Sequence, residues 1–192
     1  MPIAVSSVEG RARARVLESG GPGKWFSYVR SDYITSATDR PGPQGFLVEM
    51  DRPGVVIPPH FHRVEEFQVV VGGGGTLGKH PIGAVTAHFA DAYTPYGPIV
   101  VGPEGLAFFT LRRLFDAGAN YMPESRAQMI CKARRNVAGE SRLERPESLA
   151  RLPAPVAETL LEPQADGVGA MLLRLGPGAT ARGPAPAAGG GQ

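Results

Sequence analysis

The most informative segment of the chain reads Gly54-Val55-Val56-Ile57-Pro58-Pro59-His60-Phe61-His62-Arg63-Val64-Glu65-Glu66, and it holds two of the four histidines. Alternate side chains of an extended strand share a face, so His60 and His62 point the same way, with their Cα atoms about 6 to 7 Å apart. Both imidazoles can then reach one ion. In a straight strand Glu66 would lie about 13 Å from His62. We therefore predict that the chain folds back near residues 63–65, in a hairpin whose return strand covers residues 66–71.

Two imidazoles and one carboxylate form the ligand set that holds non-haem Fe(II), or Mn, Ni, Co or Zn, with positions left open for substrate and oxygen. His60, His62 and Glu66 are therefore candidate metal ligands. The ligand types favour Fe(II) without selecting it. The alternative is that the two histidines lie on an edge strand and form hydrogen bonds with solvent.

Short apolar runs rich in β-branched and aromatic residues surround this segment. They cover residues 46–50, 55–57, 67–71, 85–89 and 106–111. Turn signals separate them, and we expect the four glycines of residues 72–75 to form a tight connection between neighbouring strands. Short strands at this spacing, with no helices between them, predict an all-β sandwich or barrel.

The spacing Gly54-(five residues)-His60-x-His62-(three residues)-Glu66-(six residues)-Gly73 resembles the first signature motif of the cupin superfamily. The resemblance implies a double-stranded β-helix, which is the jelly-roll or cupin barrel, with His60, His62 and Glu66 as the metal ligands. Pro95-Tyr96-Gly97 is similar to the centre of the second cupin motif. That motif is degenerate here, because three of its marker positions are changed. Phe89, Val100 and Glu104 stand where the family has Gly, His and Asn.

Three further residues are candidates for the same site. His88 is a candidate replacement for the missing second-motif histidine, and the alternative is a hydrogen-bonded, half-buried histidine. Tyr93 and Tyr96 lie near the Pro-Tyr-Gly turn, where their hydroxyls would orient a ligand at the barrel mouth. They could equally be packing residues whose hydroxyls reach water.

The composition along the chain suggests four regions. Residues 1–40 are expected to be an N-terminal arm with one short strand near residues 25–29, and residues 41–115 the cupin barrel. Residues 116–167 are expected to be a partly helical linker, with a short helix over residues 123–130. Residues 168–192 resemble the start of a second, truncated cupin repeat, as in a two-cupin protein. The alternative is one more strand of the first barrel followed by a tail.

Composition and charge exclude some classes of binding partner and indicate where in the cell the protein is found. With 20 Lys and Arg against 18 Asp and Glu, the net charge is only +2, so we expect no nucleic-acid partner. No apolar run approaches the length of a membrane span, so we expect no membrane partner. Cys131 is the only cysteine, which excludes an intramolecular disulfide framework. The N-terminus does not resemble a secretion signal, and we expect a cytoplasmic protein.

Two functions from different classes fit these observations. The first is a metal-dependent cupin enzyme that acts on a small oxygenated organic molecule, with dioxygenase-like or isomerase/lyase-like chemistry. The second is a non-catalytic cupin module that binds a small molecule or serves a structural role, and the missing second-motif histidine favours it. A shortened gene product without activity is a third alternative. A homodimer formed through sheet edges is a further expectation.

Overall fold

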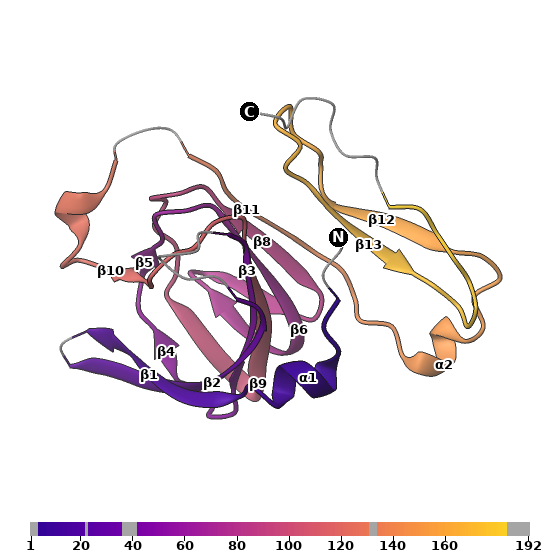
Figure 1. The fold of residues 1–192 in the computed structure, drawn as a ribbon, viewed down its shortest axis with the longest axis horizontal. Coiled ribbons are helices and arrows are strands. Elements are labelled where there is room, and N and C mark those ends of the chain that lie inside the picture. Colours follow the sequence, from indigo (N-terminus) through magenta and orange to yellow (C-terminus); the bar gives the residue numbers. More distant parts are fainter. Residues whose placement is uncertain (1–3, 22, 36–41, 131–133, 184–192) are drawn as a thin grey trace.

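The computed structural model describes residues 4–21, 23–35, 42–130 and 134–183. Cys131, the expected boundary between residues 40 and 41, and the last nine residues of the expected second repeat lie outside these ranges. The described chain consists mainly of antiparallel strands, with three short helical segments (Figure 1). These are α1 (Ser7–Arg11), a 3₁₀ turn (Arg126–Gln128) and α2 (Pro146–Leu149). The predicted all-β class is confirmed.

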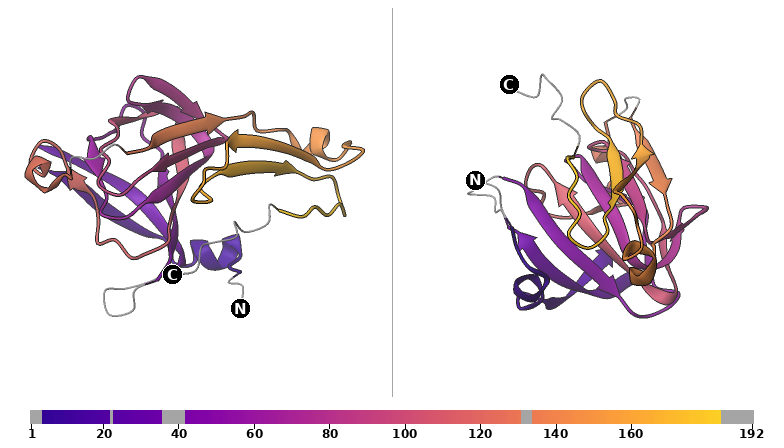
Figure 2. Two further views of the ribbon diagram at one scale, coloured as in Figure 1. Left: turned by 90° about the horizontal axis from the view of Figure 1, so that it is seen from above. Right: turned by 90° about the vertical axis from the view of Figure 1, so that its right-hand side faces the viewer.

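Most of the strands belong to one nine-stranded sheet, in which neighbours follow the order β1-β2-β3-β9-β6-β8-β11, while β4 pairs with β9 and β7 with β6. Their bounds are β1 (Arg15–Gly21), β2 (Lys24–Ile34), β3 (Gln44–Met50), β4 (Val56–Ile57), β6 (Glu66–Leu77), β7 (His80–Gly83), β8 (Thr86–Ala90), β9 (Ile99–Arg112) and β11 (Asn136–Glu140). Each predicted apolar run lies in or overlaps one of these strands. The sheet curves, so that strands distant in its order face one another (Figure 2).

The core lies on the inner face of this curved sheet. Along β9 the buried residues alternate with more exposed ones, so that Leu106, Phe108, Thr110 and Arg112 all point inward. Phe46 and Val48 of β3 belong to the same apolar cluster as Phe108. Burying a side chain of this size stabilises a fold by about 1.5 to 3 kcal/mol. The period-two pattern of β9 thus places apolar side chains in the core and a charged side chain, Arg112, at the last inward-facing position.

The region expected to be an arm contains more strand than the sequence predicts. β1 and β2 form an antiparallel hairpin, and β2 pairs with β3, so the hairpin extends the main sheet. Buried Asp32 fixes it by accepting from Arg15 at 2.7 Å and from Arg30 at 2.7 Å. No residue of β1 is fully buried, so its sequence lacks the apolar alternation by which a half-buried strand is recognised.

The tight connection predicted at residues 72–75 is wrong, because these glycines lie inside β6. Their role is to let two backbones approach closely. A Cβ atom on Gly75 would lie 1.9 Å from the carbonyl oxygen of Val100, and one on Gly73, whose φ is +60°, would lie 2.2 Å from that of Gly105. Only glycine fits such contacts between β6 and β9.

The hairpin predicted around residues 63–65 is also wrong in its pairing. The two-residue strand β5 (His60–Phe61) pairs with β10 (Asn120–Tyr121), and β6 pairs with β7, β8 and β9. The chain nevertheless turns between His62 and Glu66. The partner strand comes from a distant part of the chain, which local spacing does not reveal.

The C-terminal part of the chain departs further from the predicted linker. The helix predicted over residues 123–130 is a 3₁₀ turn, and β11 joins the main sheet beside β8. β12 (Val156–Leu161) and β13 (Ala170–Arg174) form a separate hairpin beside β11 (Figures 1 and 2). Within the described residues β13 therefore pairs with β12 and not with the main sheet. A second cupin repeat stays a prediction.

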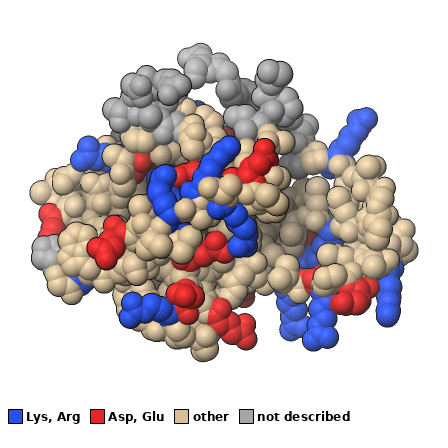
Figure 3. All heavy atoms as spheres, turned by 60° about the horizontal axis from the view of Figure 1, so that its bottom comes forward, with Lys and Arg blue, Asp and Glu red and all other residues tan. Residues whose placement is uncertain are grey.

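The charged side chains are mixed in sign over the face shown in Figure 3. Basic and acidic groups alternate there, in keeping with the small net charge of +2. None of the helices in the described ranges is both long enough and apolar enough to cross a membrane.

Candidate functional site

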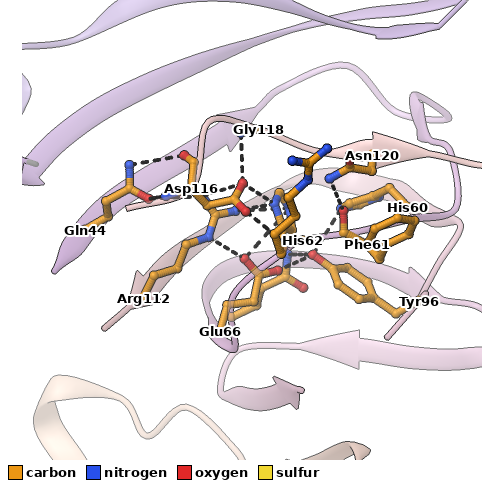
Figure 4. A network of polar contacts seen from close by, with 12 residues as sticks. Gln44, His60, Phe61, His62, Glu66, Tyr96, Arg112, Asp116, Gly118 and Asn120 are labelled. Atoms are coloured by element: carbon orange, nitrogen blue, oxygen red, sulfur yellow. Dashed lines mark hydrogen bonds and ion pairs between the residues drawn. The ribbon is translucent and has the colours of Figure 1, made fainter. Parts of the chain in front are cut away.

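Polar side chains meet inside the curved sheet, at the end where β6 begins and β9 finishes (Figure 4). His60 lies in β5, His62 directly after it, and Glu66 at the first position of β6. Glu66 is paired in register with Arg112, the last residue of β9. All four side chains are buried, with Glu66 only 2 % exposed. The structure thus brings the three predicted ligands together, along with an arginine that the motif did not include.

Arg112 contacts two of these three candidates. Its Nε donates to Oε2 of Glu66 at 2.8 Å, and its Nη2 lies 3.0 Å from both ring nitrogens of His62. A third bond, 3.3 Å long, runs from Nη1 to Oε1 of Gln44. Burial alone would raise the pKa of Glu66, but the adjacent His62 ring and the Arg112 guanidinium outweigh it and lower that pKa. Glu66 is therefore a buried carboxylate held in its ionised form.

Asp116 anchors His62 from the other side. Its Oδ1 accepts from Nδ1 of His62 at 2.9 Å, and its Oδ2 accepts from the backbone N–H of Arg63 at 2.9 Å. Burial opposes ionisation of Asp116, but these bonds and the nearby Arg112 lower its pKa to about 2. A carboxylate that accepts from Nδ1 leaves Nε2 of the same ring as the inward-facing nitrogen.

His60 is anchored in the same way, by a backbone carbonyl. Its Nδ1 donates to the oxygen of Pro58 at 2.8 Å, and its Nε2 faces the Tyr96 hydroxyl at 3.0 Å. Burial, together with the neighbouring His62, lowers the pKa of His60 to about 4, so the ring is neutral at pH 7. With the proton on Nδ1, the lone pair of Nε2 points inward.

The Tyr96 hydroxyl joins this group to a second set of side chains. It donates to Oε1 of Glu66 and accepts from Nε2 of Gln68 at 3.2 Å. Burial and the Glu66 carboxylate raise the pKa of Tyr96 well above its ordinary value, so the phenol keeps its proton. Because that single proton is directed at Glu66, the Tyr96 hydroxyl does not also donate it to Nε2 of His60, which lies 3.0 Å away.

His88 and Tyr93 lie differently from the three ligand candidates. The ring nitrogens of His88 face Oε1 of Gln68 at 3.1 Å and Oδ1 of Asn136 at 2.8 Å, which is the hydrogen-bonded alternative. Burial lowers the pKa of His88. Tyr93, whose φ is +61°, packs its ring against Phe61 with centroids 5.9 Å apart. The backbone N–H of Tyr93 donates to the carbonyl oxygen of His62 at 2.6 Å, while no hydrogen bond within the described residues links its hydroxyl to the buried polar group.

A cavity of about 320 Å³ lies against the buried polar group. His60, His62, Gln68 and Arg112 contribute polar groups to its lining, and five aromatic rings contribute apolar surface. Those rings belong to Phe26, Tyr28, Phe46, Phe108 and Tyr121. The volume is at the lower end of the range for small-molecule sites. A larger cavity of about 620 Å³ is lined in part by His80, His88 and Tyr96.

The donor chemistry of the site suits a divalent metal ion. Two imidazoles are anchored through Nδ1 so that Nε2 points inward, which is the arrangement of metal-ligating histidines. Nε2 of His62 and Oε2 of Glu66 are 3.8 Å apart, a span that two metal–ligand bonds of about 2.0 to 2.2 Å can bridge. As the side chains stand, no group of three or more His, Cys, Asp or Glu in the described ranges forms a metal site. The Arg112 guanidinium and the Tyr96 hydroxyl lie between the candidate ligands.

Two further residues of the site could have been predicted from the sequence pattern. Gln68 lies two residues after Glu66, and Arg112 lies at even spacing after Leu106, so period-two alternation places both on the inner face. Asp116 and Gln44 gave no such signal. They reach the site through contacts 54 and 72 residues away along the chain.

Comparisons with known proteins add one structural likeness. No family model matches the chain, and no curated protein matches it. A solved structure described as an uncharacterized conserved protein with a double-stranded beta-helix domain, from Klebsiella pneumoniae, is similar to this chain at 18 % identity. The match covers 53 % of this chain and 87 % of that one, with a TM-score of 0.40.

Proposed function

We propose that this protein is a metal-dependent cupin enzyme that acts on a small oxygenated organic molecule. In this proposal His60, His62 and Glu66 hold a divalent ion, with Fe(II) favoured and Mn, Ni, Co or Zn as alternatives. The observation that supports it best is the anchoring of both imidazoles through Nδ1, by Pro58 and by Asp116, which aims both Nε2 atoms inward. When bound, such an ion polarises a substrate oxygen or, as iron, supports oxygenase chemistry.

The residues around the cavity have separate roles in this proposal. The aromatic rings on the β2 side, including those of Phe26 and Tyr28, bind the apolar body of the substrate and exclude water. Gln68 and Arg112, which also line the cavity, offer N–H donors to its oxygen atoms. The substrate class that suits such a cavity is a compact, ring-containing molecule with hydroxyl, carbonyl or carboxyl oxygens.

Metal content tests the proposal directly. The purified protein, stripped and then reconstituted with Fe(II), Mn(II) or Zn(II), should hold about one ion per chain. Both His60→Ala and Glu66→Gln should lose it, while His80→Ala should keep it, because exposed His80 lies in β7 outside the polar group. Metal absent from the reconstituted wild type, or retained in both site variants, would contradict the proposal.

The second candidate is a non-catalytic module that binds a small molecule. The interposed Arg112 and Tyr96 favour it, because they provide hydrogen-bond partners for Glu66 and His62 without a metal. Ligand-observed NMR with a panel of catechols, β-diketones and hydroxy acids separates the two candidates. Binding by metal-free protein that Tyr121→Ala weakens, and that His80→Ala leaves unchanged, supports this module and locates the ligand in the smaller cavity.

The assembly of the protein is a separate proposal. A homodimer would use a free sheet edge, and β1 lies at one end of the described strand order with β2 as its neighbour. Light scattering of the purified chain tests whether it is a dimer. The cytoplasmic location and the second cupin repeat also remain predictions.

A further inference from the structure

The guanidinium group of Arg112 lies between two of the candidate metal ligands, the carboxylate of Glu66 and the imidazole of His62. Its Nε is 2.8 Å from Oε2 of Glu66, and its Nη2 is 3.0 Å from Nε2 of His62. These are the same two atoms that a metal ion would share, and they lie 3.8 Å apart. The side chain of Arg112 is 5 % exposed, so bulk water does not screen its charge.

The buried negative charges of this site need a cation beside them when no metal is present. Glu66 and Asp116 place two carboxylates in the polar group, and both side chains are nearly inaccessible to solvent. Arg112 compensates them, with one charge-assisted bond to Glu66 and with its Nη1 3.9 Å from Oδ1 of Asp116. A divalent ion and a guanidinium cannot use the same lone pairs, and their like charges repel at this separation.

We propose that Arg112 is an internal cation that occupies the metal position in the metal-free protein, and that a divalent ion binds by displacing it. The inference rests on the proposed function. Partners for the displaced guanidinium are already present on its far side. Oε1 of Gln44 accepts from Nη1 at 3.3 Å, Asp116 lies close to the same nitrogen, and the Phe46 ring lies 5.5 Å from the guanidinium carbon.

The competition predicts a specific effect on metal affinity. A site that must first release an internal cation binds with an affinity reduced by the fraction of molecules in the released state. Replacing the cation with an apolar chain of similar length, in Arg112→Met, removes that competition. We expect Arg112→Met to bind Zn(II) or Mn(II) at least about tenfold more tightly than the wild type. We also expect its thermal midpoint to rise more on addition of the ion.

The neighbouring arginine supplies the matched control. Arg113 is exposed and pairs with Glu65 at 3.1 Å on the outer face, so Arg113→Met should leave metal affinity unchanged. Arg112→Gln is the second variant, because it keeps hydrogen-bond donors for Glu66 without the charge. It guards against a failure of Arg112→Met to fold, and we expect the same direction of change. Isothermal titration and circular dichroism with and without metal provide the readouts.

Each outcome decides a different point. Unchanged or weaker metal affinity in a folded Arg112 variant overturns the inference, because Arg112 would then support the bound ion instead of competing with it. If wild type and variants bind metal equally, with loss in Glu66→Gln, the inference fails and the proposed function stands. If neither wild type nor any variant binds metal, the proposed function itself fails. Metal bound by the Arg112 variants and only weakly by the wild type supports both.

Discussion

Asp116 and His62 are 54 residues apart in the chain and are joined by a 2.9 Å hydrogen bond between Oδ1 and Nδ1. The same carboxylate accepts from the backbone N–H groups of Arg63 and Gly118. This arrangement fixes the orientation of the His62 ring before any ligand arrives, because three donors hold the carboxylate in place.

The first prediction concerns that bond. Replacing Asp116 with Ala should weaken binding of Zn(II) or Mn(II) by about 10- to 100-fold, because the ring loses the acceptor that orients it. Metal competition titrations measure the effect. Asp51→Ala, at an exposed position after β3, is the control and should bind as the wild type does. Equal affinity in Asp116→Ala and wild type would show that His62 is oriented without this carboxylate.

The second prediction concerns the Tyr96 hydroxyl. Tyr96→Phe removes the group that donates to Glu66 and accepts from Gln68, so two buried polar groups lose a partner. We expect the free energy of unfolding to fall by about 1 to 3 kcal/mol in urea titrations of the metal-free protein. Tyr93 packs its ring against Phe61 and its hydroxyl is not part of this network, so Tyr93→Phe should change stability by less than about 0.5 kcal/mol. Similar losses in both variants would contradict the assigned network.

The third prediction is a pH dependence outside the site. Arg135 binds Asp91 through several hydrogen bonds, the shortest side-chain one being 2.8 Å, and chiefly these bonds lower the pKa of Asp91 below its ordinary value of 3.8. A carboxylate with a lowered folded-state pKa contributes stability above its unfolded pKa and loses it as the pH falls through the folded pKa. Asp91→Asn should therefore cost about 1 kcal/mol at pH 6.

That cost should shrink as the pH is lowered below 3.8, because Asp91 then takes up a proton in the unfolded chain, while the folded protein takes it up only at a lower pH. Comparing the unfolding free energy of the wild type and the variant at pH 6 and pH 3 isolates this carboxylate from the others that titrate in the same window. A difference that stays constant between the two pH values would exclude the Asp91–Arg135 pair as its source.

The fourth prediction uses two glycines of the same strand. In Gly75→Ala the new methyl group would lie 1.9 Å from the carbonyl oxygen of Val100, so β6 and β9 must separate, at a cost of about 1 to 3 kcal/mol or more. In Gly72→Ala the nearest atom is the Cβ of Ala107 at 3.5 Å, an ordinary contact. Thermal unfolding should distinguish the two variants. Equal midpoints would mean that the close approach of β6 and β9 does not require glycine.

Several features could be predicted from the sequence because they depend on local spacing. Strands are periodic, so the apolar runs indicated where β3, β6, β8 and β9 lie, and His60 and His62 were expected on one face. Other features depend on which strand meets which. β5 pairs with β10, and residues 72–75 continue a strand where a turn was predicted. Nothing within a few residues of either segment distinguishes these outcomes.

The amino-acid sequence alone established the all-β class and identified His60, His62 and Glu66 as candidate ligands. Both depend on side-chain alternation and glycine positions, which are local properties of a few consecutive residues. The tertiary structure alone decided what surrounds them. Arg112, Asp116 and Gln44 reach the same buried space only when β3 and β9 close over β6. The contacts of the His62 imidazole with the Asp116 carboxylate and the Arg112 guanidinium form only in the folded protein. These contacts set the balance of charge inside the site.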